Sequence, residues 1–177
     1  MPGRPSQSTV PAWKPQRDAG VIGSIPPGPV VPRLSLMHQL TTIIEISTRG
    51  PGLYEFTRDF NAFVAASGTR TGLVTAYCRH TSASLLIQEN ADSDVKTDLL
   101  EFFRRVAPEG MDWIVHRTEG PDDMPAHIKS ALTQTSIGVP VIDGDPVLGT
   151  WQGIYLFEHR ARPHRRQVVL HLIGERA

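Results

Sequence analysis

Proline is distributed very unevenly along this 177-residue chain. Eight of its 15 prolines lie before residue 34, at positions 2, 5, 11, 15, 26, 27, 29 and 32. Proline interrupts helices and sheet ladders, and the few apolar residues of this stretch follow neither a strand nor a helix period. We therefore predict that residues 1–36 lie outside the folded domain, either as a disordered proline-rich tail or because translation starts at Met37. An organelle transit peptide is a third interpretation, although the segment is only moderately rich in Arg and Ser.

The remaining residues, 37–177, are predicted to form one domain, because about 140 residues is a common size for a single core. Residues 1–36 carry four basic residues against Asp18 alone, a net charge of +3, which leaves −3 for the domain of this formally neutral chain. The balance argues against nucleic-acid binding through bulk positive charge. No apolar run reaches the ~18–20 residues of a membrane helix. A single cysteine, Cys78, excludes an internal disulfide and favours a cytoplasmic location.

Apolar periodicity predicts an α+β domain with mostly antiparallel strands. About seven strands are expected, over residues 40–47, 72–79, 83–88, 113–117, 139–142, 150–159 and 167–173. Three helices are expected, over residues 54–66, from the capping residues 92–94 to 106, and over 125–134. The middle helix has the strongest apolar stripe. Residues 160–166 are predicted to join the last two strands as a hairpin turn.

Two polar segments follow or interrupt the predicted strands. In the first, His80-Thr81-Ser82-Ala83-Ser84, hydroxyls and backbone N–H groups would hold an anion and His80 would move a proton near neutral pH. The same residues also suit an ordinary tight turn. In the second, Asn90 and Asp92 place oxygen atoms suited to Mg²⁺ directly after a strand. Helix capping accounts for the neighbouring Ser93 and Asp94.

Three further segments combine polar groups with special positions. His127 follows three acidic residues in the first turn of a predicted helix, where the helix dipole favours a neutral ring that acts as base or ligand. A neutral surface histidine is the alternative. Trp151 and Gln152, flanked by glycines, suit a flat heteroaromatic ring, or else Trp151 packs in the core. The basic run that contains Arg165 suits phosphate, or else it is a solvated turn.

Four of these motifs, in this order, resemble the YjbQ-like family, whose members are known as secondary thiamine-phosphate synthase enzymes. The motifs are His80-Thr81-Ser82-Ala83-Ser84, Glu89-Asn90-Ala91-Asp92, Asp122-Asp123-Met124-Pro125-Ala126-His127 and Gly149-Thr150-Trp151-Gln152. The resemblance spans residues 37–175. It implies a two-sheet α+β sandwich, a homotrimer and a side reaction that joins hydroxymethylpyrimidine diphosphate to thiazole phosphate and releases pyrophosphate.

The resemblance and the motifs together suggest a site for a phosphorylated small molecule. Catalytic roles are expected for His80, Asn90 and His127, and Mg²⁺ or another divalent metal is expected on Asp92. Substrate binding is expected for Thr81, Ser82, Ser84, Thr150, Trp151, Gln152 and Arg165. Such a site would neutralise a diphosphate and align two flat rings. Two alternatives stay open: a metal-assisted hydrolase with His80, His127 and Asp92 as ligands, and a non-catalytic trimer that binds a metabolite.

Overall fold

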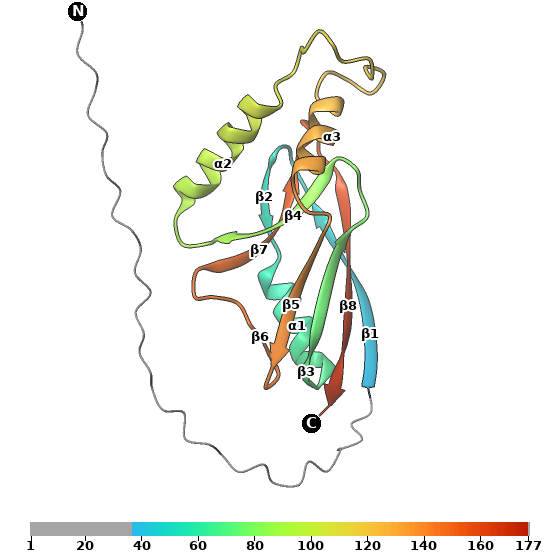
Figure 1. The fold of residues 1–177 in the computed structure, drawn as a ribbon, viewed down its shortest axis with the longest axis vertical. Helices are drawn as coiled ribbons and strands as arrows, with labels where there is room; N and C mark the ends of the chain where they lie inside the picture. The colour runs from blue at the N-terminus through green and yellow to red at the C-terminus, as the bar shows by residue number, and fades with distance from the viewer. Residues whose placement is uncertain (1–36, 177) are drawn as a thin grey trace, which may run out of the picture. The chain divides into compact units, whose positions relative to one another are not determined.

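The computed structural model describes residues 37–176, which form two antiparallel sheets and three helices (Figure 1). The elements are β1 (Met37–Ser47), β2 (Gly52–Glu55), α1 (Thr57–Ser67), β3 (Thr69–Cys78), β4 (Ala83–Glu89), α2 (Ser93–Val106), α3 (Asp123–Leu132), β5 (Ser136–Ile142), β6 (Asp145–Pro146), β7 (Gln152–Glu158) and β8 (Arg165–Arg176). The large sheet has the order β1-β8-β3-β5-β6, and the small sheet has the order β2-β7-β4. The predicted α+β class with two sheets is therefore confirmed. The expectation for residues 1–36 lies outside the described residues.

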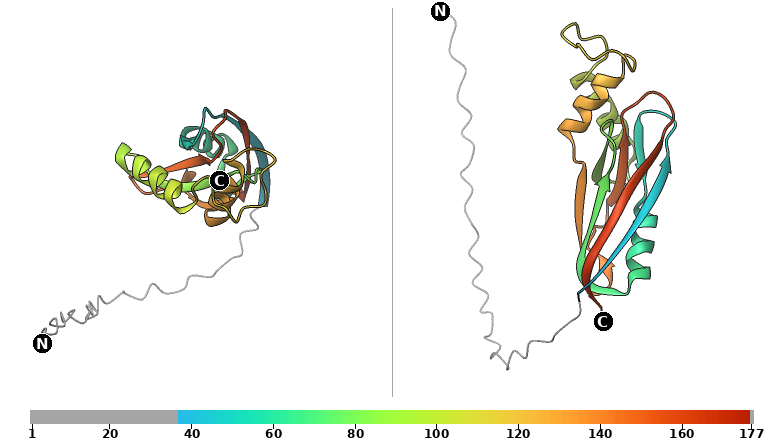
Figure 2. Two further views of the ribbon diagram at one scale, coloured as in Figure 1. Left: turned by 90° about the horizontal axis from the view of Figure 1, so that it is seen from above. Right: turned by 90° about the vertical axis from the view of Figure 1, so that its right-hand side faces the viewer.

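The core lies between the two sheets because alternate residues of their strands point inward. Val168, Leu170 and Leu172 of β8 are fully buried on one face of the large sheet. They share one apolar cluster with Phe60 of α1 and Leu156 of β7. Helix α1 and the small sheet thus cover the same face of the large sheet (Figure 2). None of the described helices combines the length and the apolar character needed to cross a membrane.

The first predicted helix begins later than expected. Residues Gly52–Glu55 pair with β7 as an additional strand, and α1 starts only at Thr57. The N–H of Phe56 still donates to the carbonyl of Ile154 at 2.9 Å, so the ladder continues to the helix N-cap. The helix ends at Gly68, whose φ of +65° is the left-handed conformation that glycine adopts readily.

Two local predictions are wrong. Residues Trp113–Arg117 form no strand, because Trp113 lies in a turn and the next four residues have no regular secondary structure. Only Ile114 among them is buried, so they offer no sheet face to pack. The segment Arg160–Arg166 is not a hairpin turn, because β7 belongs to the small sheet and β8 to the large one. The segment instead carries the chain across the edge of the sandwich.

A buried ion pair fixes this crossing. Glu158, the last residue of β7, accepts hydrogen bonds from the Arg166 guanidinium of β8 at 2.6 and 2.7 Å and from the Thr48 hydroxyl at 2.8 Å. Arg166 also donates to the Ser82 hydroxyl at 3.2 Å. Burial alone would raise the pKa of Glu158, but the hydrogen bonds from Arg166, the Arg160 N–H and Thr48 together lower it. Both sheets are therefore tied through one carboxylate.

Helix α2 forms as predicted but keeps its apolar stripe out of the core. Asp92 is its N-cap and accepts a hydrogen bond from the Asp94 N–H at 2.8 Å. No residue of the helix is buried, and Phe102 and Val106 are 57% and 44% exposed. Its contact with the small sheet includes Phe103, whose ring meets the Phe157 ring edge-on at 5.2 Å. A strong amphipathic pattern here marks a face that the described chain leaves uncovered.

Replacement of Glu158 should test the ion pair. The variant Glu158→Ala leaves the Arg166 guanidinium buried without its counter-charge, so we expect the free energy of unfolding to fall by about 3–5 kcal/mol. Urea denaturation monitored by circular dichroism measures this free energy. The matched control is Arg70→Ala, which removes an exposed pair with Asp143 and should cost less than about 1 kcal/mol. An equal decrease in the free energy of unfolding in the two variants would show that the buried pair stabilises the fold no more than the exposed pair does.

The stability should also depend on pH through His159, which is 3% exposed. Burial, followed by the charge of Lys129, lowers the pKa of His159 from 6.5 to about 3. Because the folded pKa is depressed, the contribution of the neutral ring is complete above pH 6.5 and is lost as the pH falls toward 3. Between pH 6 and 5 the wild type should lose up to about 1.4 kcal/mol more than His159→Phe. Parallel losses in urea titrations of the two proteins would contradict this assignment.

Candidate metal centre

The start of α3 is fixed by Arg160, which follows β7. Its Nε donates to Asp122 Oδ2 at 2.9 Å, its Nη1 contacts Asp123 Oδ1, and its Nη2 donates to the Glu119 carbonyl at 2.8 Å. Asp122 also accepts the N–H of Ala161 at 2.8 Å. Helix α3 consequently begins at Asp123, two residues before the predicted Pro125.

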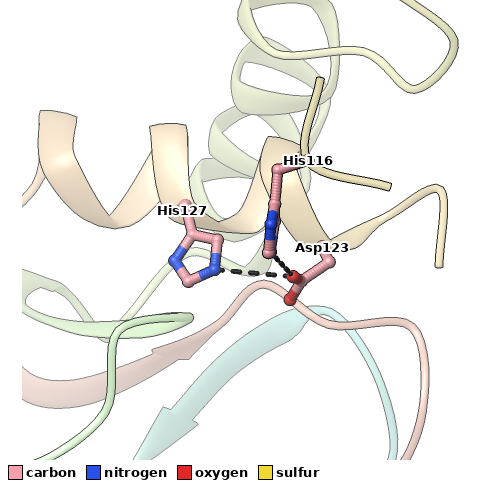
Figure 3. Close-up of side chains that lie close together, drawn as sticks. All are labelled: His116, Asp123 and His127. Carbon is pink, nitrogen blue, oxygen red and sulfur yellow. Dashed lines mark hydrogen bonds and ion pairs between the residues drawn. The ribbon is translucent and has the colours of Figure 1, made fainter. Parts of the chain in front are cut away.

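Two histidines converge on the buried carboxylate of Asp123 (Figure 3). His127 lies four residues after Asp123, so both side chains occupy one face of α3. His116 reaches the same point from the loop before the helix. The Nε2 atoms of His116 and His127 lie 2.7 and 3.5 Å from Asp123 Oδ2, and the three atoms all lie within 4.8 Å of one another.

The hydrogen bond of the His127 ring determines which of its nitrogens faces the carboxylate of Asp123 without a proton when the ring is neutral. Nδ1 of His127 lies 3.0 Å from the carbonyl of Thr81, which only accepts, so Nδ1 carries a proton. In the neutral ring Nε2 is then bare, and it faces Asp123 Oδ2, a second acceptor. Two acceptors at this distance repel each other unless a cation lies between them or the ring is protonated. The arrangement therefore suits a positive ion.

The donor set suits a transition metal better than magnesium. Two imidazole nitrogens and one carboxylate oxygen are typical of Zn²⁺ and of Fe²⁺, whereas Mg²⁺ prefers oxygen ligands and water. The side chains of His116 and His127 are 43% and 32% exposed, which leaves room for water or substrate. The Thr81 carbonyl orients one ligand and Arg160 orients another, as second-layer partners do in metal sites.

The structure brings part of the predicted site to this place. His80, Thr81 and His127 line one hollow of about 380 Å³ between the end of β3 and α3, together with Arg79. Nε2 of His80 accepts the N–H of Gln167 at 2.8 Å. Burial, and then the charge of Arg166, lower the pKa of His80. His80 is therefore neutral near pH 7, with its ring proton on Nδ1.

Three other predicted residues lie around this end of the sandwich without lining the hollow. The Ser82 hydroxyl is held by Arg166, and the buried Ser84 hydroxyl pairs with His159 Nε2 at 2.9 Å. Arg165 is exposed and pairs with Glu45 at 3.2 Å.

The remaining predicted residues gather at the opposite end of β4. Seven residues of strand, roughly 20 Å, separate them from His127. Asn90 donates its N–H to the Trp151 carbonyl at 2.9 Å, and Asp92 caps α2. The exposed residues Thr150, Trp151 and Gln152 are their neighbours, and Gln152 Oε1 accepts the Gly149 N–H at 2.8 Å. Within one chain, Asn90 and Asp92 therefore do not meet the histidines.

Sequence reasoning missed His116 and Asp123 as site residues. For Asp123 the signal was present, because the spacing Asp123-x-x-x-His127 places both side chains on one helical face. His116 carried no such signal, since it lies in an irregular loop whose path depends on contacts distant in sequence.

Comparison with known proteins places the chain in one family. A family model described as "UPF0047 protein YjbQ-like" matches residues 42–175. A UPF0047 protein of Synechocystis is 54% identical over 138 residues, which cover 78% of this chain and 94% of the relative. The UPF0047 protein YjbQ of Escherichia coli O157:H7 is 38% identical over 133 residues, covering 75% and 96%. The chain belongs to the YjbQ-like UPF0047 family.

Solved structures agree with the fold. An uncharacterized conserved protein of the YjbQ/UPF0047 family from Clostridium acetobutylicum aligns with a TM-score of 0.66 at 34% identity, covering 73% of this chain and 98% of that one. A protein of unknown function from Sulfolobus solfataricus aligns with a TM-score of 0.73, covering 79% and 100%, and at 23% identity it supports the fold alone.

Metal binding should depend on both histidines. After equilibration with Zn²⁺, Mn²⁺ or Mg²⁺ and removal of free ions, elemental analysis should find about one Zn²⁺ per chain and little Mg²⁺. His116→Ala and His127→Ala should each weaken zinc affinity by about 100-fold or more, since even loss of a second-layer partner costs about 10–100-fold. His171→Ala, on the outer face of β8, is the matched control. Equal zinc uptake by all four proteins would refute this centre.

Proposed function

We propose that this protein is a divalent-metal-dependent enzyme that hydrolyses a phosphorylated small molecule at the His116, Asp123 and His127 centre. The observation that carries the proposal is the convergence of two imidazole Nε2 atoms, of His116 and His127, on Asp123 Oδ2 at 2.7 and 3.5 Å. A zinc-type metal in such a donor set supplies an activated water and polarises a phosphoryl oxygen. Compared with the hydrolase alternative predicted from the sequence, this assignment keeps His127 as a ligand and replaces His80 and Asp92 with His116 and Asp123.

The hollow beside the centre supplies groups for the substrate. Arg79 is exposed at its wall, where a guanidinium matches a phosphate group. Thr81, an exposed residue with a hydroxyl group, lines the same hollow. His80 keeps its proton on Nδ1 because Nε2 accepts from Gln167, so it serves as a hydrogen-bond donor to the phosphate rather than as a base.

The thiamine-phosphate synthase reaction is the second candidate, implied by the family resemblance. It requires positive charge beside a departing pyrophosphate, and Arg79 next to the metal centre would supply it. Two flat rings would also have to be held in line. Trp151 and Gln152 would take part only from another subunit, because they lie at the far end of β4 from the centre.

We further propose the homotrimer and the cytoplasmic location that the family resemblance and the single cysteine suggest. Apolar surface supports the assembly, since Phe102 of α2 and Tyr77 on the outer face of the large sheet are 57% and 50% exposed. Covering such faces is a common reason for association. In such a trimer, the cluster around Asn90 could take part in the site only from a neighbouring copy, because β4 separates the two within one chain.

Phosphate release from p-nitrophenyl phosphate tests the hydrolase. The zinc-loaded protein should release phosphate, and His127→Ala should reduce kcat/KM by about 100-fold through loss of metal. His80→Ala should retain the metal but lower kcat by about 100-fold, because it removes a donor to the phosphate. His171→Ala should behave as wild type. Full activity in His127→Ala would reject the proposed centre.

Growth of a thiamine-auxotrophic strain that lacks its own synthase separates the two candidates. Rescue by the wild type that disappears with His127→Ala and with Asn90→Ala would favour the synthase. No rescue at high expression, together with phosphate release, would favour the hydrolase.

A further inference from the structure

Two hollows border the metal centre, one at each of its histidines. His127 lines the hollow of about 380 Å³ that also contains Arg79. His116 lines a second hollow, of about 260 Å³, in the irregular segment that joins α2 to α3 (Figure 1). No residue lines both hollows, although the Nε2 atoms of the two histidines lie within 4.8 Å of each other. A molecule bound at the centre therefore has two separate spaces beside it.

The second hollow is built by the loop itself. Its lining residues all lie between Gly110 and Pro121. Gly110 and Gly120 have φ angles of +78° and +113°, which glycine adopts at little cost and other residues rarely adopt. Met111, Ile114 and Pro121 make its wall largely apolar, and Ile114 is only 8% exposed. The loop thus has a fixed inner side next to His116.

The formal charge in both hollows comes from arginine. Among residues 37–176, Arg79 is the only Asp, Glu, Lys or Arg residue that lines the first hollow, and Arg117 is the only one that lines the second. The cavity between α2 and α3 is different, because carboxylates outnumber basic side chains along its wall. An anionic group is consequently favoured on either side of the metal centre.

The charge of Arg117 is held in place but not neutralised. Its Nε donates to the carbonyl of Ile114 at 2.7 Å, and its Nη2 donates to the carbonyl of Asp112 at 3.0 Å. Unlike Arg160 and Arg166, it has no carboxylate within 4.0 Å in the described part of the chain. The remaining N–H groups, on Nη1 and Nη2, form the edge that matches two oxygens of a carboxylate or phosphate.

Arg79 is in the same state in the first hollow. Its Nη1 donates to the side-chain carbonyl of Gln167 at 3.4 Å, and this acceptor is also uncharged. The centre is thus flanked by two guanidinium groups whose charge no described carboxylate offsets. Two such groups in separate hollows fit two acidic groups of one molecule better than a single phosphate.

We propose that the substrate of the metal centre carries two anionic groups, a phosphate beside Arg79 and a second acidic group that Arg117 binds in the hollow beside His116. This inference rests on the proposed hydrolase and names its substrate class, a phosphate monoester with a terminal carboxylate or a second phosphate. The second hollow lies just below the range of about 300–1,000 Å³ of drug-sized sites, so the arm that enters it is short.

The reaction on such a substrate is a simple hydrolysis. The oxygen of water forms a bond to phosphorus, and the ester P–O bond breaks. The departing alcohol takes a proton and keeps the second acidic group, while inorganic phosphate stays beside Arg79. Because Arg117 binds only the departing part, its loss should affect molecules with the second acidic group and no others.

Non-hydrolysable phosphonates test the role of Arg117. 3-Phosphonopropionate and 4-phosphonobutyrate end in a carboxylate, and propylphosphonate and butylphosphonate have a methyl group in its place. In isothermal titration calorimetry on the zinc-loaded full chain, at least one acid should bind about tenfold more tightly than its alkyl counterpart. Propane-1,3-bisphosphonate distinguishes the two sources of charge, since tighter binding than 4-phosphonobutyrate identifies the second group as a phosphate.

Variants of the two arginines assign the gain in affinity to one hollow. Arg117→Met should abolish the gain and leave the affinity for the alkylphosphonates unchanged. Arg79→Met should weaken acids and alkylphosphonates alike by about tenfold, so that the gain persists. The matched control is Arg70→Met, because Arg70 lines neither hollow and pairs with Asp143 at the surface. This control should bind every probe as the wild type does.

Elemental analysis of the same samples separates the two levels of the proposal. If the wild type takes up no zinc, the proposed hydrolase and this inference are both overturned. If zinc and the alkylphosphonates bind but neither acid nor the bisphosphonate binds more tightly, this inference alone is overturned. A gain that survives in zinc-loaded Arg117→Met has the same consequence.

Discussion

The buried pair between Glu158 and Arg166 is the interaction on which the rest of this structure depends. It sits where the chain leaves the small sheet and enters the large one, and it holds Thr48 and Ser82 as well. The carboxylate also fixes the backbone N–H of Arg160 at 3.0 Å. That position places the guanidinium of Arg160 on Asp122 and Asp123, so the geometry of the candidate metal centre depends on the ion pair between the two sheets.

Local patterns predicted the elements well and their partners less well. The strand at residues 40–47 and the helix after Asp92 were clear because periodicity and capping are local properties. The path of residues 160–166 was not predictable in this way. Two strands that are adjacent in sequence suggest a hairpin, and only the structure shows that β7 and β8 belong to different sheets joined by a buried ion pair. The surroundings of α2 were not predictable for a related reason. Periodicity shows that one face of the helix is apolar, but it does not show what covers that face.

The candidate site was likewise predictable only where local sequence patterns determine it. The motif with Asp122, Asp123 and His127 drew attention to the right helix, and His80 and His127 do meet in one hollow. His116 was not predicted, because an irregular loop without any local sequence pattern brings it to the site. Asn90 and Trp151 were grouped with the histidines by their order in the sequence. The seven residues of β4 keep the two groups apart within one chain, a separation that sequence order cannot express.

Helices α2 and α3 line a cavity of about 450 Å³, and the two helices are held to the sandwich in very different ways. On one side α3 is anchored by Arg160 and by Ser130, whose hydroxyl donates to the Ala83 carbonyl at 3.0 Å. On the other side α2 contributes no side chain to the core. Because α2 packs against the small sheet through Phe103 and Phe157 but has no buried residue of its own, a displacement of α2 would change the width of the cavity at the loss of few buried contacts. The domain therefore pairs a rigid frame with one adjustable wall.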